Sequence, residues 1–166
     1  MYKQISVMAV ATVLALSSAA QAQSCLTQSE RAAMAMRHIQ TQLMVGALAC
    51  RGSDDMGQRR LYTGFVLGNR QSLGRHGRAL QAYFARLYGS DAQTRLDRHV
   101  TGVANRISRD ANRQDDFCSR IAAFGRTVLS SDLNARTVLD LSASAPVGFK
   151  SVQPDCDTGT MASITE

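Results

Sequence analysis

Arginine side chains form the chemically most suggestive pattern in this sequence. Between residues 58 and 113 there are eleven arginines and three aspartates, a local net charge of +8. At about 100° per residue along a helix, two sets of arginines fall in equivalent arcs away from the apolar face. Because guanidinium forks match phosphate and carboxylate, the pattern predicts an anion-binding surface. An ordinary solvated helix face is the open alternative. The residues concerned are Arg75, Arg78, Arg86, Arg95, Arg98, Arg106, Arg109 and Arg113.

Four cysteines offer a second chemistry, disulfide formation. They are Cys25, Cys50, Cys118 and Cys156, and none belongs to a Cys-x-x-Cys motif. An even number in an exported chain favours two bridges, which can form in three ways. Cys25 and Cys50 flank one expected helix and would lie more than about 30 Å apart, too far for a bridge. Two pairings remain, and we favour Cys25–Cys156 with Cys50–Cys118 over Cys25–Cys118 with Cys50–Cys156.

Residues suited to acid–base catalysis or metal binding are scarce. Residues 23–166 contain two glutamates, of which Glu30 fits a helix cap and Glu166 is the last residue. The sequence has no nucleotide-binding loop, nucleophile elbow or zinc-protease motif. We therefore expect neither an enzyme nor a metal or other cofactor.

The sequence contains three histidines, and His and Met side chains can together hold a haem or a copper ion. His38 lies near Met34 on one expected helix. Methionine on an apolar stripe is ordinary core filler, so packing is the favoured role for His38. His76 and His99 stand beside arginines and are expected on the surface.

Helices must position these side chains, since apolar residues recur at spacings of three and four. Residues 27–51 open with a capping box, Thr27 to Glu30, and residues 90–112 with a second, Ser90 to Gln93. Glycines predict a break near residues 68–73 within the helical segment 58–88. Further helices are expected from residue 114 and over residues 132–141. The fold class is all-α, a small disulfide-stapled bundle of four to five helices.

The two ends of the chain differ in composition from this bundle. Lys3, an apolar run over residues 5–16 and Ala20-Gln21-Ala22 are typical of a cleavable signal peptide, residues 1–22. A helical domain is expected over residues 23–142, followed by a flexible Ser/Thr/Pro-rich tail, residues 143–166, with a possible tether through Cys156. These features predict an exported protein, periplasmic or extracellular, without a transmembrane segment after residue 22.

Export changes the expected partner of the arginines. We expect a non-enzymatic protein that binds an anionic envelope component: lipid headgroups, lipopolysaccharide, an acidic polymer or an acidic protein. Nucleic acid is not expected, because the few aromatic residues lie largely on the apolar stripes. Residues 26–30, Leu-Thr-Gln-Ser-Glu, resemble the Leu-Thr-x-x-Gln motif of the Spy and CpxP family with Glu30 in the Gln position. That resemblance implies the runner-up, a periplasmic holdase-like chaperone or stress protein. A haem, metal or small enzymatic helical bundle is the third alternative.

Overall fold

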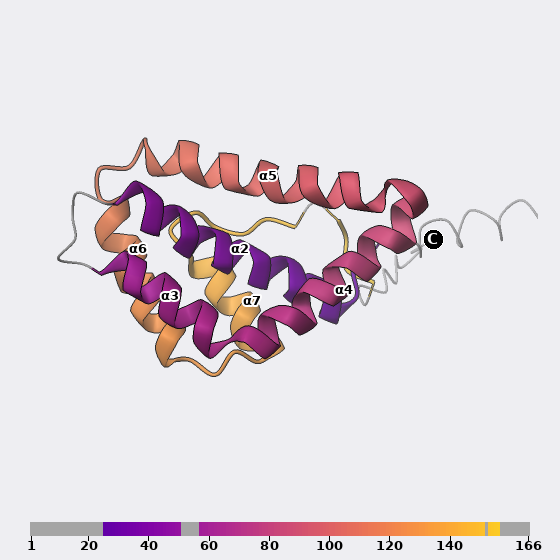
Figure 1. The fold of residues 1–166 in the computed structure, drawn as a ribbon, viewed down its shortest axis with the longest axis horizontal. Helices are drawn as coiled ribbons and strands as arrows, with labels where there is room; N and C mark the ends of the chain where they lie inside the picture. Colours follow the sequence, from indigo (N-terminus) through magenta and orange to yellow (C-terminus); the bar gives the residue numbers. More distant parts are fainter. Residues whose placement is uncertain (1–24, 51–56, 152, 157–166) are drawn as a thin grey trace, which may run out of the picture.

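Helices make up most of the computed structural model, which describes residues 25–50, 57–151 and 153–156 (Figure 1). If α3 and α4 are counted as one interrupted helix, the described residues form five helices, which confirms the predicted all-α class. The predicted signal peptide, residues 1–22, lies outside the described residues, as do residues 157–166 of the predicted tail. The helices are α2 (Gln28–Ala49), α3 (Gln58–Gly68), α4 (Arg70–Tyr88), α5 (Ala92–Ala111), α6 (Phe117–Ser130) and α7 (Ala135–Ser144).

Helix α2 is the centre of the bundle and contacts α3, α4, α5, α6 and α7 (Figure 1). It starts with the predicted capping box, in which the Glu30 amide donates to Thr27 Oγ1 at 3.3 Å and the Thr27 amide to Glu30 Oε2 at 2.9 Å. Because neighbours surround it, α2 buries residues on nearly every face, including the polar His38 and Gln42.

The predicted break in the second helical segment lies at Asn69, between α3 and α4. The Asn69 side-chain amide donates to the Phe65 carbonyl at 2.9 Å and satisfies an acceptor at the end of α3. Helix α4 ends at Gly89, whose φ of 51° favours glycine.

The second predicted capping box, from Ser90 to Gln93, is wrong. Ser90 lies inside a short 3-10 turn, η2 (Gly89–Asp91), and α5 begins at Ala92 without a side-chain cap. Gln93 donates instead to Asp97 Oδ1 at 2.9 Å, one turn along α5. Because Ser90 is part of this turn, it does not stand at the N-cap position of α5.

Two disulfides fasten opposite ends of α2. Cys50 is bonded to Cys118 on α6, and Cys25 is bonded to Cys156. This is the pairing that the sequence favoured. Both cysteines next to α2 are buried, whereas Cys118 is half-buried and Cys156 is exposed.

The described part of the chain after α7 packs on the bundle, whereas residues 152 and 157–166 of the predicted tail lie outside the described residues. We call residues 145–156 the C-terminal strap, of which 145–151 and 153–156 are described. Ala145, Pro146 and Val147 are buried, and the strap runs along α2 towards its N-terminus (Figure 1). There Leu26 and Asp155 form an isolated β-bridge, and Arg31 forms an ion pair with Asp155.

No helix among the described residues combines the length and the apolar character needed to cross a bilayer.

Candidate functional site

A pocket of about 230 Å³ opens where the start of α2, the end of α4, the start of α5 and the strap meet. It lies over the smaller of the two apolar clusters of the described chain, the one that contains Met34, Tyr83 and Phe84. The residues that line it are Leu26, Met34, Tyr83, Phe84, Tyr88, Arg95, Arg98, His99, Phe149, Lys150, Ser151 and Gln153.

The inner wall of the pocket is apolar and aromatic. The Phe84 ring meets the Tyr83 ring edge-on at 5.3 Å between centroids, the His99 ring at 5.6 Å and the Tyr88 ring at 5.7 Å. Phe149 reaches this wall from the strap. Linked rings of this kind make a firm surface for a hydrocarbon group.

The mouth of the pocket is cationic. Arg95 and Arg98 come from α5 and Lys150 from the strap, and all three are exposed. The Arg95 guanidinium carbon lies 5.3 Å from the centroid of the Tyr88 ring, a cation–π contact that leaves its donors available. None of the residues that line the pocket is acidic, and within the described residues these three cations form no ion pair.

His99 occupies one side of the pocket. It is half-buried, as is His76. Burial lowers the pKa of His99 below its ordinary value of 6.5, and the positive charges of Arg106 and Arg37 lower it further. Burial, followed by the charge of Arg75, likewise lowers the pKa of His76. His99 therefore presents a neutral ring to the pocket at neutral pH.

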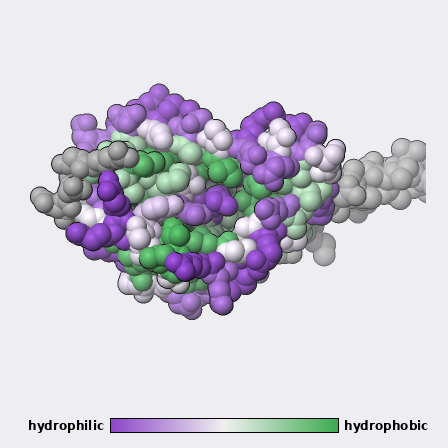
Figure 2. All heavy atoms as spheres, viewed as in Figure 1, coloured by the Kyte–Doolittle hydropathy of each residue, from purple (hydrophilic) through white to green (hydrophobic). Residues whose placement is uncertain are grey.

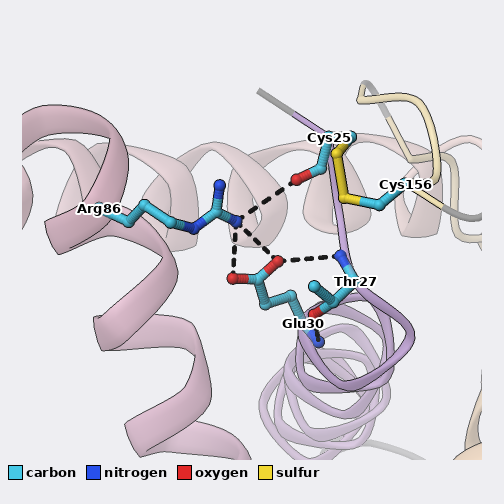
Figure 3. The surroundings of a disulfide bond; sticks show 5 residues. All are labelled: Cys25, Thr27, Glu30, Arg86 and Cys156. Atoms are coloured by element: carbon cyan, nitrogen blue, oxygen red, sulfur yellow. Dashed lines mark hydrogen bonds and ion pairs between the residues drawn. A yellow bond between two sulfur atoms is a disulfide. The ribbon is translucent and has the colours of Figure 1, made fainter. Parts of the chain in front are cut away.

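Arg86 is engaged in a structural contact (Figure 3). Its Nη2 donates to both Glu30 carboxylate oxygens, at 2.7 and 2.8 Å, and lies 3.4 Å from the Cys25 carbonyl oxygen. Burial raises the pKa of Glu30, but the hydrogen bonds from Arg86 and Thr27 outweigh it and leave the pKa below the ordinary value of 4.5. Arg86 thus ties α4 to the capping box of α2, beside the Cys25–Cys156 disulfide.

Arg106 is also drawn into the bundle. It is half-buried, its Nε is buried without a hydrogen-bond partner among the described residues, and its charge lowers the pKa of both His38 and His99. Of the eight predicted anion-binding residues, Arg86 is therefore held in an ion pair with Glu30, and Arg106 is half-buried.

The other six arginines of the predicted surface are spread over α4, α5 and the turn that follows α5. Helices α4 and α5 are joined through Gly89 and diverge from there (Figure 1); Arg75 and Arg78 belong to the first half of α4, and Arg109 belongs to the last turn of α5. Hydrophilic residues follow the edge formed by α5, and apolar residues lie between α5 and α3 (Figure 2). Near the turn, Arg95 and Arg98 gather with Lys150 at the pocket.

His38 lies in the core, as the packing interpretation expected, with 1 % of its surface exposed. Its Nε2 donates to the Val147 carbonyl at 2.6 Å, and Gln42 donates to the same oxygen. The pKa of His38 lies below its ordinary value, mainly because the side chain is buried. The hydrogen bond to Val147 raises the pKa, and the charge of Arg106 lowers it. His38 therefore holds the strap on α2 and does not line the pocket.

Groups of three or more His, Cys, Asp or Glu side chains that could hold a metal ion do not occur among the described residues. The alternative of a chaperone stays a prediction. The large apolar residues that are exposed in the described chain lie on four different helices: Leu48, Leu67, Tyr88 and Leu129.

Lys150 and Phe149 are the pocket residues that sequence reasoning missed. The favoured bridge of Cys156 to Cys25 contained a signal for them, because it requires the chain after α7 to return to the start of α2. The segment between α7 and Cys156 must span the distance back to the start of α2, and it contains Phe149 beside Lys150. These two features together indicate a segment that packs on the bundle.

Comparisons with known proteins identify no relative of this chain. No protein-family model, curated protein or solved structure matches the chain.

Proposed function

We propose that this protein is an exported, non-enzymatic binding module that holds an anionic component of the cell envelope at the mouth of the pocket. Arg95, Arg98 and Lys150 are the residues that would contact the anion. One observation carries the proposal: three exposed cations from two distant parts of the chain border one pocket that has no acidic side chain in its lining.

Electrostatics supports this role over a purely structural one for the three cations. Like charges gathered at one place repel one another, and no described carboxylate offsets them with an ion pair. An incoming phosphate or carboxylate would relieve that repulsion and accept charge-assisted hydrogen bonds from two guanidinium groups.

Export is the second part of the proposal. It is supported by the signal-like residues 1–22 and by two disulfides, which persist in oxidising compartments. In the envelope the available anions are lipid headgroups, lipopolysaccharide phosphates, acidic polymers and acidic proteins.

A matched pair of double variants tests the proposal. Binding to anionic and to neutral lipid vesicles is measured by co-sedimentation for the wild type, for Arg95→Gln with Arg98→Gln, and for Arg109→Gln with Arg113→Gln. Both variants remove two exposed charges from α5 or from the turn that follows it, but only the first removes them from the pocket.

We expect the wild type and the Arg109/Arg113 variant to bind anionic vesicles and the Arg95/Arg98 variant to lose most of that binding. Binding should weaken as salt rises from about 0.01 to 0.5 M, because screening shortens the reach of the charges. Equal binding to neutral vesicles, or equal losses in the two variants, would contradict the proposal.

A further inference from the structure

The pocket combines an apolar interior with a cationic mouth. A ligand that matches both parts has an apolar group and an anionic group. Met34, Tyr83, Phe84 and Phe149 offer hydrocarbon and ring surfaces inside. Arg95, Arg98 and Lys150 offer positive charge outside. A simple inorganic anion would leave the apolar wall exposed to water, and a neutral hydrocarbon would leave the three cations uncompensated.

We propose that the pocket binds a single-chain anionic amphiphile, with one acyl chain against the aromatic wall and a carboxylate or phosphate head between Arg95, Arg98 and Lys150. The site presupposes the anion binding proposed above and specifies its ligand.

Size limits the apolar part to one chain. The pocket holds about 230 Å³, whereas a cavity of about 150 Å³ in another protein admits a benzene ring, and sites for larger drug-like molecules start at about 300 Å³. One acyl chain of moderate length therefore fits, and the paired chains of a phospholipid do not.

Charge sets the orientation. His99 carries no charge at neutral pH because burial and the charges of Arg106 and Arg37 lower its pKa, so the positive charge among the lining residues is confined to the three exposed cations. The head then stays at the solvent-facing end, and the chain passes Tyr88 and Phe84 towards Met34.

Calorimetric titration of the full chain with butyrate, hexanoate, octanoate and 1-octanol tests the assignment. Burial of methylenes predicts binding about fourfold tighter per methylene, or about 250-fold over the four methylenes between butyrate and octanoate. We expect 1-octanol to bind about tenfold more weakly than octanoate, because it lacks the charge that the mouth recognises.

Two pairs of variants locate the site in the same titration. Arg98→Gln should weaken octanoate about tenfold and leave 1-octanol unchanged, whereas Arg109→Gln should change neither. Ser151→Trp places a large ring at the mouth and should weaken both ligands, and Ser119→Trp, at an exposed position of α6, should weaken neither.

The outcomes separate this assignment from the proposed function. Affinity that does not change with chain length, while anionic vesicles still bind through Arg95 and Arg98, would overturn the amphiphile and leave the anion-binding module in place. Equal affinity for octanoate and 1-octanol would remove the role of the charged mouth. Octanoate binding that appears only in a chain ending at Cys156 would mean that residues 157–166 occupy the pocket of the full chain in place of an amphiphile. Absence of binding to octanoate and to anionic vesicles alike would overturn both proposals.

Discussion

Glu30 and Arg86 show how a single residue can serve two elements. In the sequence, Glu30 completes a capping box for one helix, and Arg86 belongs to a charged arc on another. In the structure the Glu30 carboxylate accepts hydrogen bonds from the Thr27 amide and from Arg86 (Figure 3). Residue type and helical spacing predicted the capping box. The ion pair between Arg86 and Glu30 could not be predicted in this way, because it depends on the packing of α4 on α2.

Glu30→Gln should lower the free energy of unfolding by roughly 1 kcal/mol at pH 7, because it removes the charge from partly exposed hydrogen bonds. The pKa of Glu30 is lowered in the folded protein, so this contribution is complete above the ordinary pKa of 4.5 and is lost as the pH falls through the folded pKa.

Urea unfolding of wild type and Glu30→Gln at several pH values checks this prediction. The stability difference should shrink steadily below about pH 4.5. A difference that stays constant from pH 7 to pH 3 would mean that the charge of Glu30 contributes nothing.

At the scale of elements, the sequence predicted most helices and missed the connections between them. Hydrophobic periodicity and glycine placement predicted α2, the break at Asn69 and the helix α5, because these depend on neighbours in sequence. The Ser90 cap failed because a short turn replaced it. The strap was missed because its order comes from Cys25, His38 and Gln42, residues more than a hundred positions away.

Glycines within the helices fall into two kinds that packing distinguishes. A Cβ added at Gly46 would lie 2.7 Å from Ile121 Cγ1, so α2 and α6 approach closely there, whereas a Cβ at Gly102 would have no neighbour within 4 Å. Gly46→Ala should therefore destabilise the protein by about 1–2 kcal/mol in spite of its better helix propensity.

Gly102→Ala is the matched control and should stabilise by about 0.5–1 kcal/mol, since α5 gains propensity without a clash. Thermal unfolding of both variants gives the comparison. Stabilisation by both substitutions would show that α2 and α6 can move apart at no cost.

For the whole molecule, the two disulfides differ in their position relative to the pocket. Cys50–Cys118 fastens α2 to α6, remote from the pocket, and Cys25–Cys156 holds the strap that supplies Phe149 and Lys150 to the pocket. The arginine types of the site were predictable from sequence. The pocket was not, because it forms only when the strap returns to the start of α2.

Removing either bridge by paired Cys→Ala substitutions should cost about 2–5 kcal/mol of stability. Only loss of Cys25–Cys156 should also weaken octanoate binding, by more than about tenfold, because it frees one wall of the pocket. Calorimetric titration at a temperature where circular dichroism shows both variants folded provides the test. Equal octanoate affinity in the two variants would show that the strap does not contribute to octanoate binding.

Methionine methyl groups offer the most direct measurement of the central claim, that the pocket holds the chain of an anionic amphiphile. Met34 lines the pocket, and Met36, two residues along α2, is buried in the other apolar cluster. In a titration of methyl-labelled protein with octanoate, we predict saturable shifts of the Met34 resonance and an unchanged Met36 resonance, with both unchanged on addition of butyrate at the same concentrations. An unshifted Met34 resonance at octanoate concentrations that saturate calorimetric binding would contradict the account.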